Sequence, residues 1–357
     1  MLKGKITEFS IKLTVSLFAL SLLSVSAAWA EDSFAVDGYG QAWYISDDSD
    51  VSTGEIKSEF FTRRARLGAK GKYSEGDFPV KFRLLGEFAG GSATLLDSYL
   101  DIDFNPLFQV QVGQFKYHFT EIGTTSSKVK AIGLLYRPEV VQNIHGNLGQ
   151  TGGSLRDVGV RFHGARKGDI TYGYNLEIVN GDGINKADRN DDKVIIAHIF
   201  GSKGGVKLFG AYFNGKDGVE GSETDEKGMT AGASYKGGGV WVQAEYAAAT
   251  YDQTGAGDLK PKGWYLQAAY DVMPELQLLA RYDWAEEASN QSDNEMTTTA
   301  IGVNYRISKR ATISANYFMR DADNNYDEKT LLGRSGSETL TGSKVGNVLV
   351  TQFEYVF

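Results

Sequence analysis

Residues 311–320 read Ala-Thr-Ile-Ser-Ala-Asn-Tyr-Phe-Met-Arg and alternate between apolar and polar side chains almost throughout. In an extended strand, successive side chains point to opposite faces of the sheet. One face of this stretch then carries Ile313, Ala315, Tyr317 and Met319. The other face carries Thr312, Ser314, Asn316 and Arg320. A strand with one apolar and one polar face fits a wall that separates lipid from water.

The same alternation recurs along the chain, in stretches of about ten residues. We identify sixteen of them, at 34–45, 58–73, 78–90, 94–104, 108–119, 155–166, 170–180, 193–201, 205–214, 227–236, 239–250, 262–273, 275–286, 296–307, 311–320 and 346–357. The gaps between them are alternately short, as at Gly237-Gly238, and long, as between Phe119 and Leu155. Short turns at one rim, long loops at the other and an even strand count are typical of bacterial outer-membrane barrels. The sequence therefore predicts an all-β fold, a transmembrane antiparallel up-and-down β-barrel of about sixteen strands.

The first thirty residues have the pattern of an export signal. A basic start leads into the apolar residues 13–25, and Ala28-Trp29-Ala30 has the small-x-small pattern of a signal-peptidase site. We therefore expect residues 1–30 to be a cleaved signal peptide and residues 31–357 to form a single barrel domain. Together with the predicted barrel, this signal leads us to expect the protein in the bacterial outer membrane.

Composition argues against several other classes of protein. Cysteine is absent, which removes thiolate catalysis and thiolate metal ligands. The formal charge of −8 disfavours a nucleic-acid partner, because phosphate binding needs a basic excess. No Gly-x-Ser-x-Gly motif occurs, and the four histidines are scattered through the chain, at His118, His145, His163 and His198. We expect no enzymatic activity, no cofactor and no metal site.

The carboxyl terminus supports the barrel independently. The last stretch ends with aromatic residues at every second position, Phe353, Tyr355 and the terminal Phe357. This resembles the terminal signature of proteins that the outer-membrane assembly machinery inserts. An ordinary amphipathic strand is the alternative.

Four short motifs point to a family. They are Phe61-Thr-Arg-Arg-Ala-Arg-Leu-Gly68, Val112-Gly-Gln-Phe-Lys116, Arg156-Asp-Val-Gly-Val160 and Asn180-Gly-Asp-Gly-Ile-Asn185. With the strand count, they make the chain resemble the phosphate-selective porin O and P family over its whole mature length. The resemblance implies a homotrimer of sixteen-stranded barrels, each with a third loop folded into its own pore. Residues 120–154 would be that loop.

The candidate functional residues are basic. If residues 74–77 form the turn of a hairpin, Lys70 lies opposite Lys81, Gly68 opposite Arg83 and Arg64 opposite Glu87. Like charges directly opposite each other cost stability in a sheet, so a water-filled lumen between them makes more sense than a core. The predicted anion-steering set is Arg64, Arg66, Lys70, Lys72, Lys81 and Arg83 on the wall, with Lys128, Lys130 and Arg137 in the third loop. A solvated wall with incidental salt bridges is the alternative.

An acidic set opposes this track, at Asp97, Asp101 and Asp103. The function indicated is an outer-membrane porin, a water-filled channel for small anions, with phosphate among them, and for small hydrophilic solutes. If the acidic set cancels the basic track, a non-selective or cation-tolerant general porin results. A structural or adhesin-type barrel is a further alternative, and it would keep the long loop outside.

The expected partners follow from the barrel and its loops. The outward faces would contact outer-membrane lipid, and the acid-rich stretch of residues 217–226 could bind lipopolysaccharide through divalent cations. A plain solvated loop explains that stretch as well, because the ligand spacing of a calcium loop is not met. Residues 193–201 and 205–214 are apolar on both faces, so they could include a contact between subunits.

Overall fold

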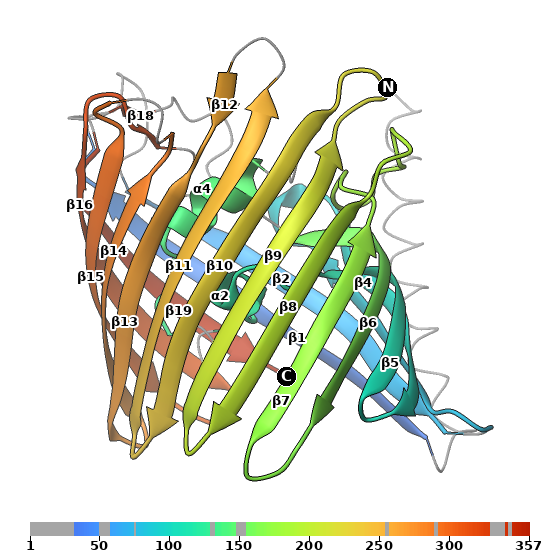
Figure 1. Ribbon diagram of the computed structural model, residues 1–357. Helices are drawn as coiled ribbons and strands as arrows, with labels where there is room; N and C mark the ends of the chain where they lie inside the picture. Colours follow the sequence, from blue (N-terminus) through green and yellow to red (C-terminus); the bar gives the residue numbers. More distant parts are fainter. Residues whose placement is uncertain are drawn as a thin grey trace, which may run out of the picture.

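The long described strands form one closed β-barrel, and two short strands near the carboxyl terminus form a separate pair (Figure 1). The computed structural model describes residues 32–49, 58–74, 76–128, 133–147, 155–253, 257–288, 292–328, 340–341 and 345–357. The predicted signal peptide lies outside the described residues, as does Lys130. Closure comes from the first strand, which pairs with the second and also with the last.

Sixteen long strands build the wall, which confirms the predicted count. They are β1 (Ser33–Asp47), β2 (Ser58–Tyr73), β3 (Val80–Glu87), β4 (Thr94–Asn105), β5 (Phe108–Lys116), β6 (Arg156–Arg166), β7 (Thr171–Val179), β8 (Val194–Lys203), β9 (Val206–Asp217), β10 (Thr224–Gly237), β11 (Val240–Gln253), β13 (Lys262–Met273), β14 (Leu276–Glu286), β15 (Glu295–Arg306), β16 (Ala311–Ala322) and β19 (Val348–Val356). The shorter described elements are η1 (Ala89–Gly91), α2 (Glu121–Thr124), α4 (Glu139–Asn147), β12 (Gly257–Leu259), β17 (Asp327–Glu328) and β18 (Leu340–Thr341).

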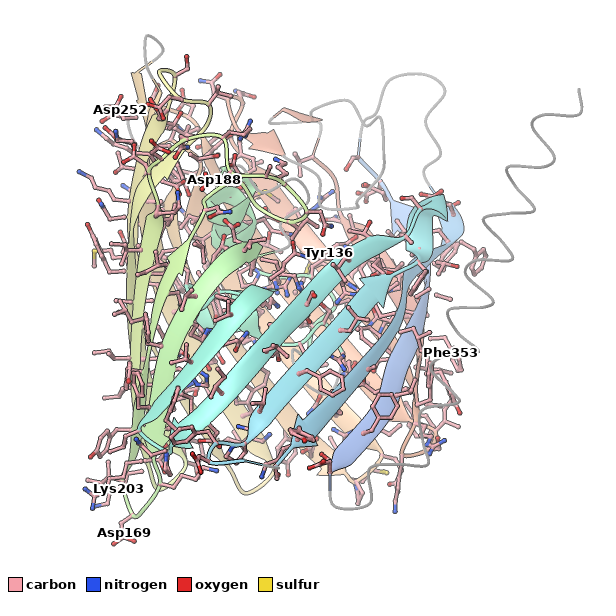
Figure 2. All side chains as sticks on the ribbon, turned by 90° about the vertical axis from the view of Figure 1, so that its right-hand side faces the viewer. Tyr136, Asp169, Asp188, Lys203, Asp252 and Phe353 are labelled. Atoms are coloured by element: carbon pink, nitrogen blue, oxygen red, sulfur yellow. The ribbon has the colours of Figure 1, made fainter. Side chains whose placement is uncertain are left out.

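Turn chemistry separates the two rims. The β8–β9 turn consists of Gly204 and Gly205, with φ of 58° and 87°, a geometry that glycine adopts without strain and that matches the twist of a hairpin. Figure 2 places Asp169 and Lys203 at this short-turn rim, and Asp188 and Asp252 at the opposite rim with the longer loops. Both ends of the closing sheet lie at the short-turn rim, where β1 begins opposite the end of β2 and Phe357 bonds to Gly38.

The two faces of the strands differ as the alternation predicts. On β16, Ile313, Tyr317 and Met319 are among the large exposed apolar side chains, whereas Ser314 and Asn316 point inward and are almost fully buried. Exposed apolar and aromatic side chains continue around the outside of the barrel, as a lipid-facing wall requires. Among the described residues, no helix is long and apolar enough to cross a membrane.

The predicted register between β2 and β3 was wrong by two residues. Lys70 lies opposite Arg83, and Lys72 lies opposite Lys81. The turn is longer than expected, because pairing begins only at Val80, after Pro79, which has no backbone N–H to donate. A slip of two residues keeps every side chain on its own face, so the basic residues still point inward.

The described part of the third loop, residues 117–128 and 133–147, lies against the inner wall. Its apolar residues pack on inward-facing side chains of the strands. Phe119 meets Phe213 of β9 edge to face, with ring centroids 4.6 Å apart, and Tyr136 meets Phe318 of β16 in the same way at 5.1 Å. This packing explains why β8 and β9 are apolar on both faces: one face meets lipid and the other meets the loop.

A charge on the lipid face is expected to destabilise the barrel according to its depth. Ile301 lies at the middle of β15 and is 52% exposed. Ile301→Arg should lower the unfolding free energy by about 2–4 kcal/mol. Ile307→Arg, an equally exposed position at the turn, should cost about 0–1 kcal/mol. Urea unfolding followed by gel mobility measures both, and equal losses would contradict the assigned membrane depth.

Candidate functional site

The third loop crosses the lumen to the wall opposite β5. The Tyr136 carbonyl accepts a hydrogen bond from Arg281 of β14 at 2.6 Å, and the Leu135 N–H donates to Asn316 of β16 at 2.8 Å. Farther along, the Ile144 carbonyl accepts from Tyr251 of β11 at 2.8 Å. These bonds hold α4 and the residues before it inside the barrel (Figure 1).

The predicted basic residues of β2 and β3 all point into the lumen, but most of them are paired with carboxylates. Arg83 and Lys70 both bind Asp37 of β1, the lysine at 3.4 Å. Lys81 reaches Asp103 at 3.4 Å and Asp101 at 3.9 Å. Near the short-turn rim, the positive charge of these residues is therefore largely balanced by carboxylates.

The predicted acidic residues are paired as well. Asp97 binds Arg156 of β6 at 2.6 Å, and Asp101 contacts His163 at 2.9 Å. Asp103 binds Lys81. All three aspartates therefore belong to ion-pair networks within the wall and do not form an unpaired acidic row.

A second group of cations gathers where the loop leaves β5. We name this group the basic cluster: Arg63, Arg64 and Arg66 of β2, Lys116 of β5, Arg156 of β6, and Lys128 and Arg137 of the loop. Lys116 and Arg137 share one acceptor, the Thr125 carbonyl, at 2.9 and 3.4 Å. Arg66 and Lys128 lie over the same ring, that of Tyr39, at 5.6 and 5.2 Å from its centroid.

Few carboxylates balance the basic cluster. In the described part of the chain, two carboxylates form ion pairs with the cluster. Glu87 binds Arg66 at 2.7 Å, and Asp97 binds Arg156. The acceptors described for Arg64, Lys116 and Arg137 are neutral: the Gln41 amide and backbone carbonyls. Gln41 in turn donates to Glu354 at 2.6 Å. The cluster therefore keeps an excess of positive charge.

Burial and neighbouring cations act together on Arg137. Burial, followed by repulsion from Arg66, Arg156 and Arg63, lowers its pKa from 12.5 to about 10. A guanidinium with this pKa is still charged at neutral pH. The shift reflects the burial of the guanidinium first and the neighbouring cations second.

Three members of the basic cluster were not predicted from the sequence. Lys116 and Arg156 close and open two of the quoted motifs, and Arg63 lies within a third. Alternation alone places Arg63 on the lipid face. A β-bulge changes this, because Gln41 pairs with Arg64 whereas Ala42 pairs with Thr62, and Arg63 becomes the extra residue, with its guanidinium over the Trp43 ring.

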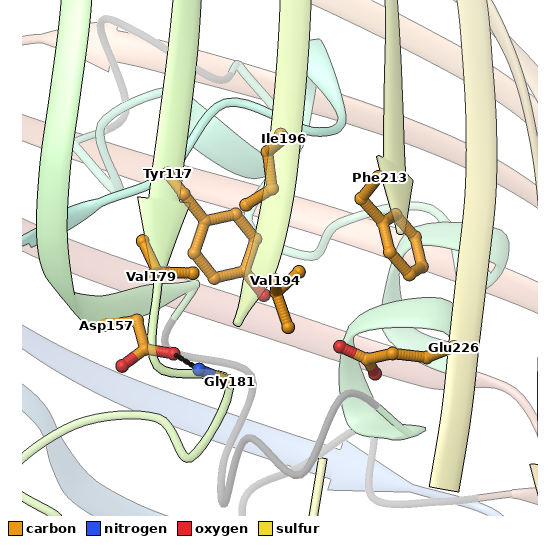
Figure 3. Close-up of a pocket in the computed structure, with 8 residues that line it drawn as sticks. All are labelled: Tyr117, Asp157, Val179, Gly181, Val194, Ile196, Phe213 and Glu226. Carbon is orange, nitrogen blue, oxygen red and sulfur yellow. Dashed lines mark hydrogen bonds between the residues drawn. The ribbon is translucent and has the colours of Figure 1, made fainter. Parts of the chain in front are cut away.

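A small pocket lies beside the base of the loop (Figure 3). Its wall is mostly apolar, with Asp157 on one side and Glu226 on the other. Asp157 is occupied in holding the next loop, since it accepts the Gly181 N–H at 2.7 Å and the Gly183 N–H at 3.3 Å. Glu226 was grouped with the acidic external loop in the sequence, but it is only 3% exposed.

Within the described ranges, no group of three or more His, Asp or Glu residues is arranged to hold a metal ion.

The comparisons with known proteins assign the family. A sequence model described as Gram-negative porin matches residues 16–325, which is most of the chain. The chain belongs to the Gram-negative porin family. No curated protein sequence matches it. It is thus an outer-membrane channel for small solutes.

Solved structures show the same fold at low sequence identity. The porin superposes on an anion-selective porin from Comamonas acidovorans with a TM-score of 0.73 and 18% identity, over 92% of this chain and 100% of that one. It superposes on OmpT of Vibrio cholerae in its trimer form with a TM-score of 0.68 and 13% identity, over 91% and 99%. OmpF of Salmonella typhi, in complex with daunomycin, gives 0.61 and 12%, over 91% and 97%.

Proposed function

We propose that this porin prefers small anions, and that the basic cluster sets this preference at the narrowest part of the pore. The observation that carries the proposal is the set of neutral acceptors around Arg64, Lys116 and Arg137. An ion that passes these side chains would meet positive charge to which no carboxylate of the described residues is bound. The third loop supplies Lys128 and Arg137, so it would both narrow the pore and bring cations toward its axis.

Phosphate is the anion for which we propose the strongest interaction. Guanidinium groups match phosphate oxygens with paired donors, and the basic cluster contains several of them. The resemblance to phosphate-selective porins supports the same choice. The rival is a weakly selective general porin, which is favoured by the ion pairs of Arg83, Lys70 and Lys81.

Reversal potentials in a salt gradient across a planar bilayer decide between the two. Anion preference in chloride, with chloride current reduced by added phosphate, supports the proposal. A reversal potential near zero would leave the general porin. Cation preference would refute the anion proposal outright.

The anion preference should also depend on pH in the alkaline range. Because the pKa of Arg137 is about 10, its charge is complete at neutral pH and is lost as the pH rises through that value. We therefore expect a constant preference up to about pH 9 and a decline above it. Lysines titrate in the same range, so Arg137→Gln is the control, and its preference should decline less. The same decline in both proteins would assign the effect to lysines.

We further propose a homotrimer in the outer membrane. The exposed apolar surface around the barrel suits lipid and subunit contacts, and the similar OmpT structure is described as a trimer form. The exposed Glu220 and the half-buried Glu223 could bind lipopolysaccharide through divalent cations. The mass of the native detergent complex tests the trimer, and a strictly monomeric particle would reject it.

A further inference from the structure

Three carboxylates of the wall bind the backbone of the third loop. Each is almost fully buried and accepts an N–H from a loop residue. The pairs are Glu177 of β7 with His118 at 3.0 Å, Glu245 of β11 with Glu121 at 2.8 Å, and Asp283 of β14 with Glu139 at 3.1 Å. Two of these N–H groups belong to the first residues of α2 and α4. First-turn N–H groups have no partner within their own helix, so each helix begins on a wall carboxylate.

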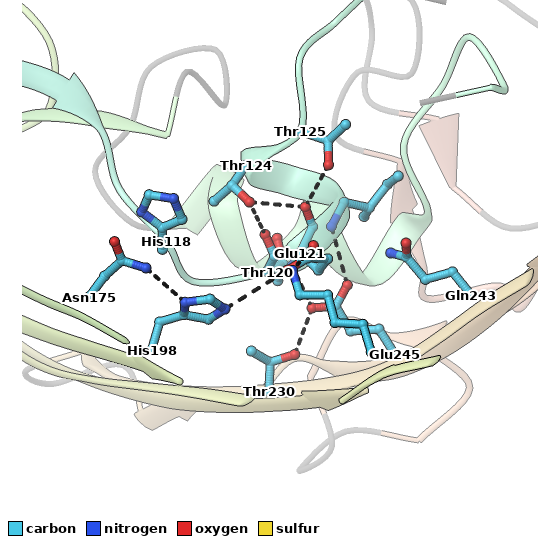
Figure 4. A network of polar contacts seen from close by, with 12 residues as sticks. His118, Thr120, Glu121, Thr124, Thr125, Asn175, His198, Thr230, Gln243 and Glu245 are labelled. Carbon is cyan, nitrogen blue, oxygen red and sulfur yellow. Dashed lines mark hydrogen bonds and ion pairs between the residues drawn. The ribbon is translucent and has the colours of Figure 1, made fainter. Parts of the chain in front are cut away.

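Glu245 differs from the other two in its partners. Glu177 also binds Arg161 at 2.7 Å, and Asp283 binds Arg281 at 2.6 Å. Among the described residues, Glu245 has no such cation. Its remaining partners are neutral donors. Thr230 donates at 2.8 Å (Figure 4), Tyr265 donates at 2.7 Å, and the Ile122 N–H makes a long bond at 3.4 Å.

The dependence between Glu245 and the loop is mutual. A buried carboxylate without its hydrogen bonds is costly, because nothing replaces the lost hydration. The N–H groups of Glu121 and Ile122 are two of its four donors. The side chain of Glu121 adds a separate contact, since Lys207 binds it at 2.5 Å, and it lies 3.8 Å from His198.

Residues of α2 and its C-cap bind cations of the basic cluster. Two carbonyls of this short segment accept from its cations: Ile122 from Arg137, and Thr125 from both Lys116 and Arg137. A shift of α2 would therefore move the acceptors that orient these side chains. Glu245 itself lies on the wall and has no described bond to Lys116 or Arg137.

We propose that Glu245 is a positioning residue of the pore, which fixes α2 against the wall and thereby sets the conductance of the channel and the arrangement of the basic cluster. The inference rests on the proposed role of the third loop in narrowing the pore. A segment held against a wall can only move away from it, which here means into the lumen. Loss of the anchor should therefore obstruct the pore rather than widen it.

The first test compares two substitutions of Glu245 in planar bilayers. Glu245→Ala removes the anchor and should lower the mean single-channel conductance, with frequent brief closures. Glu245→Gln keeps an oxygen that can accept the Glu121 N–H, so its conductance should stay near that of the parent. The control is Glu226→Ala, which removes an equally buried glutamate that makes no described bond to α2. It should leave conductance unchanged.

A second pair of variants isolates the backbone bond if Glu245→Ala does not fold. Glu121→Pro removes the N–H that Glu245 accepts, and proline is favoured at the first position of a helix. The preceding residue, Thr120, is extended, with φ of −93° and ψ of 141°, as a residue before proline requires. Glu121→Ala removes the same side chain but keeps the N–H. Conductance should be lower and noisier in Glu121→Pro than in Glu121→Ala.

The outcomes separate this inference from the proposed function. If Glu245→Ala conducts in the same way as the parent protein, the role of Glu245 is refuted. Equal conductance of the two Glu121 variants would refute it as well. Neither result would affect the proposed function. A parent whose conductance is insensitive to removal of the loop would overturn the loop's role as constriction. Heat-dependent gel mobility confirms that each variant is a folded barrel. A merely structural role for Glu245 would lower the unfolding temperature and leave the conductance of folded channels unchanged.

Discussion

Replacing Arg64 and Arg137 together by glutamine is expected to lower the ratio of anion to cation permeability by about fivefold or more. A unit charge about 4 Å from an ion contributes about 1 kcal/mol in water, which corresponds to about fivefold in a permeability ratio. Arg64 belongs to the wall and Arg137 to the loop, and the described acceptors of both are neutral. Their loss is therefore not offset by a carboxylate that was already bound to them.

The control changes the same amount of charge outside the pore. Lys203 and Lys309 are exposed on turns of the short-turn rim. Ions farther than the Debye length of about 8 Å at physiological salt feel little of their charge. Lys203→Gln with Lys309→Gln should therefore leave the reversal potential almost unchanged. If both double variants shift it equally, net charge rather than the basic cluster determines selectivity.

Replacing residues 121–147 by a short Gly-Ser linker is expected to raise the single-channel conductance by about a factor of two and to reduce the anion preference. A sixteen-stranded barrel leaves an aqueous channel unless something fills it. Here the loop occupies that space, with α4 bonded to the inner wall (Figure 1). Removal also deletes Lys128 and Arg137, so conductance and selectivity should change together.

Shortening an external loop provides the matched comparison. Residues 218–223 between β9 and β10 lie at the long-loop rim, and residues 219–222 are exposed. Their deletion should leave both conductance and selectivity near those of the parent. Unchanged conductance after removal of residues 121–147, in channels that still fold, would show that the third loop does not form the constriction.

The barrel was predictable because its signal is local. Alternation of apolar and polar residues in β16 depends only on the two faces of one strand, and each strand repeats it independently. The turns carry their own signal, as Gly204 and Gly205 do at positions that need positive φ. Strand count, rim assignment and the inward direction of Lys70 and Lys81 therefore follow from the order of the residues alone.

The β2–β3 register was not predictable in the same way. Pairing starts beyond Pro79, and the predicted turn stopped short of it. Only the register decides that Lys70 lies beside Arg83, and that Asp37 from a third strand binds both. The pairing of the basic residues on β2 and β3 with carboxylates therefore depends on three strands together.

The sequence by itself determined that the protein is a sixteen-stranded barrel with inward basic residues, because a period of two is a property of each strand alone. Only the tertiary structure decided which charges remain uncancelled and what holds the loop. A β-bulge directs the Arg63 side chain toward the basic cluster, and the loop brings Arg137 to the same carbonyl that Lys116 binds. Glu245 meets Glu121 across more than a hundred residues of chain. Such contacts depend on the closure of the barrel around the loop, and no local pattern encodes them.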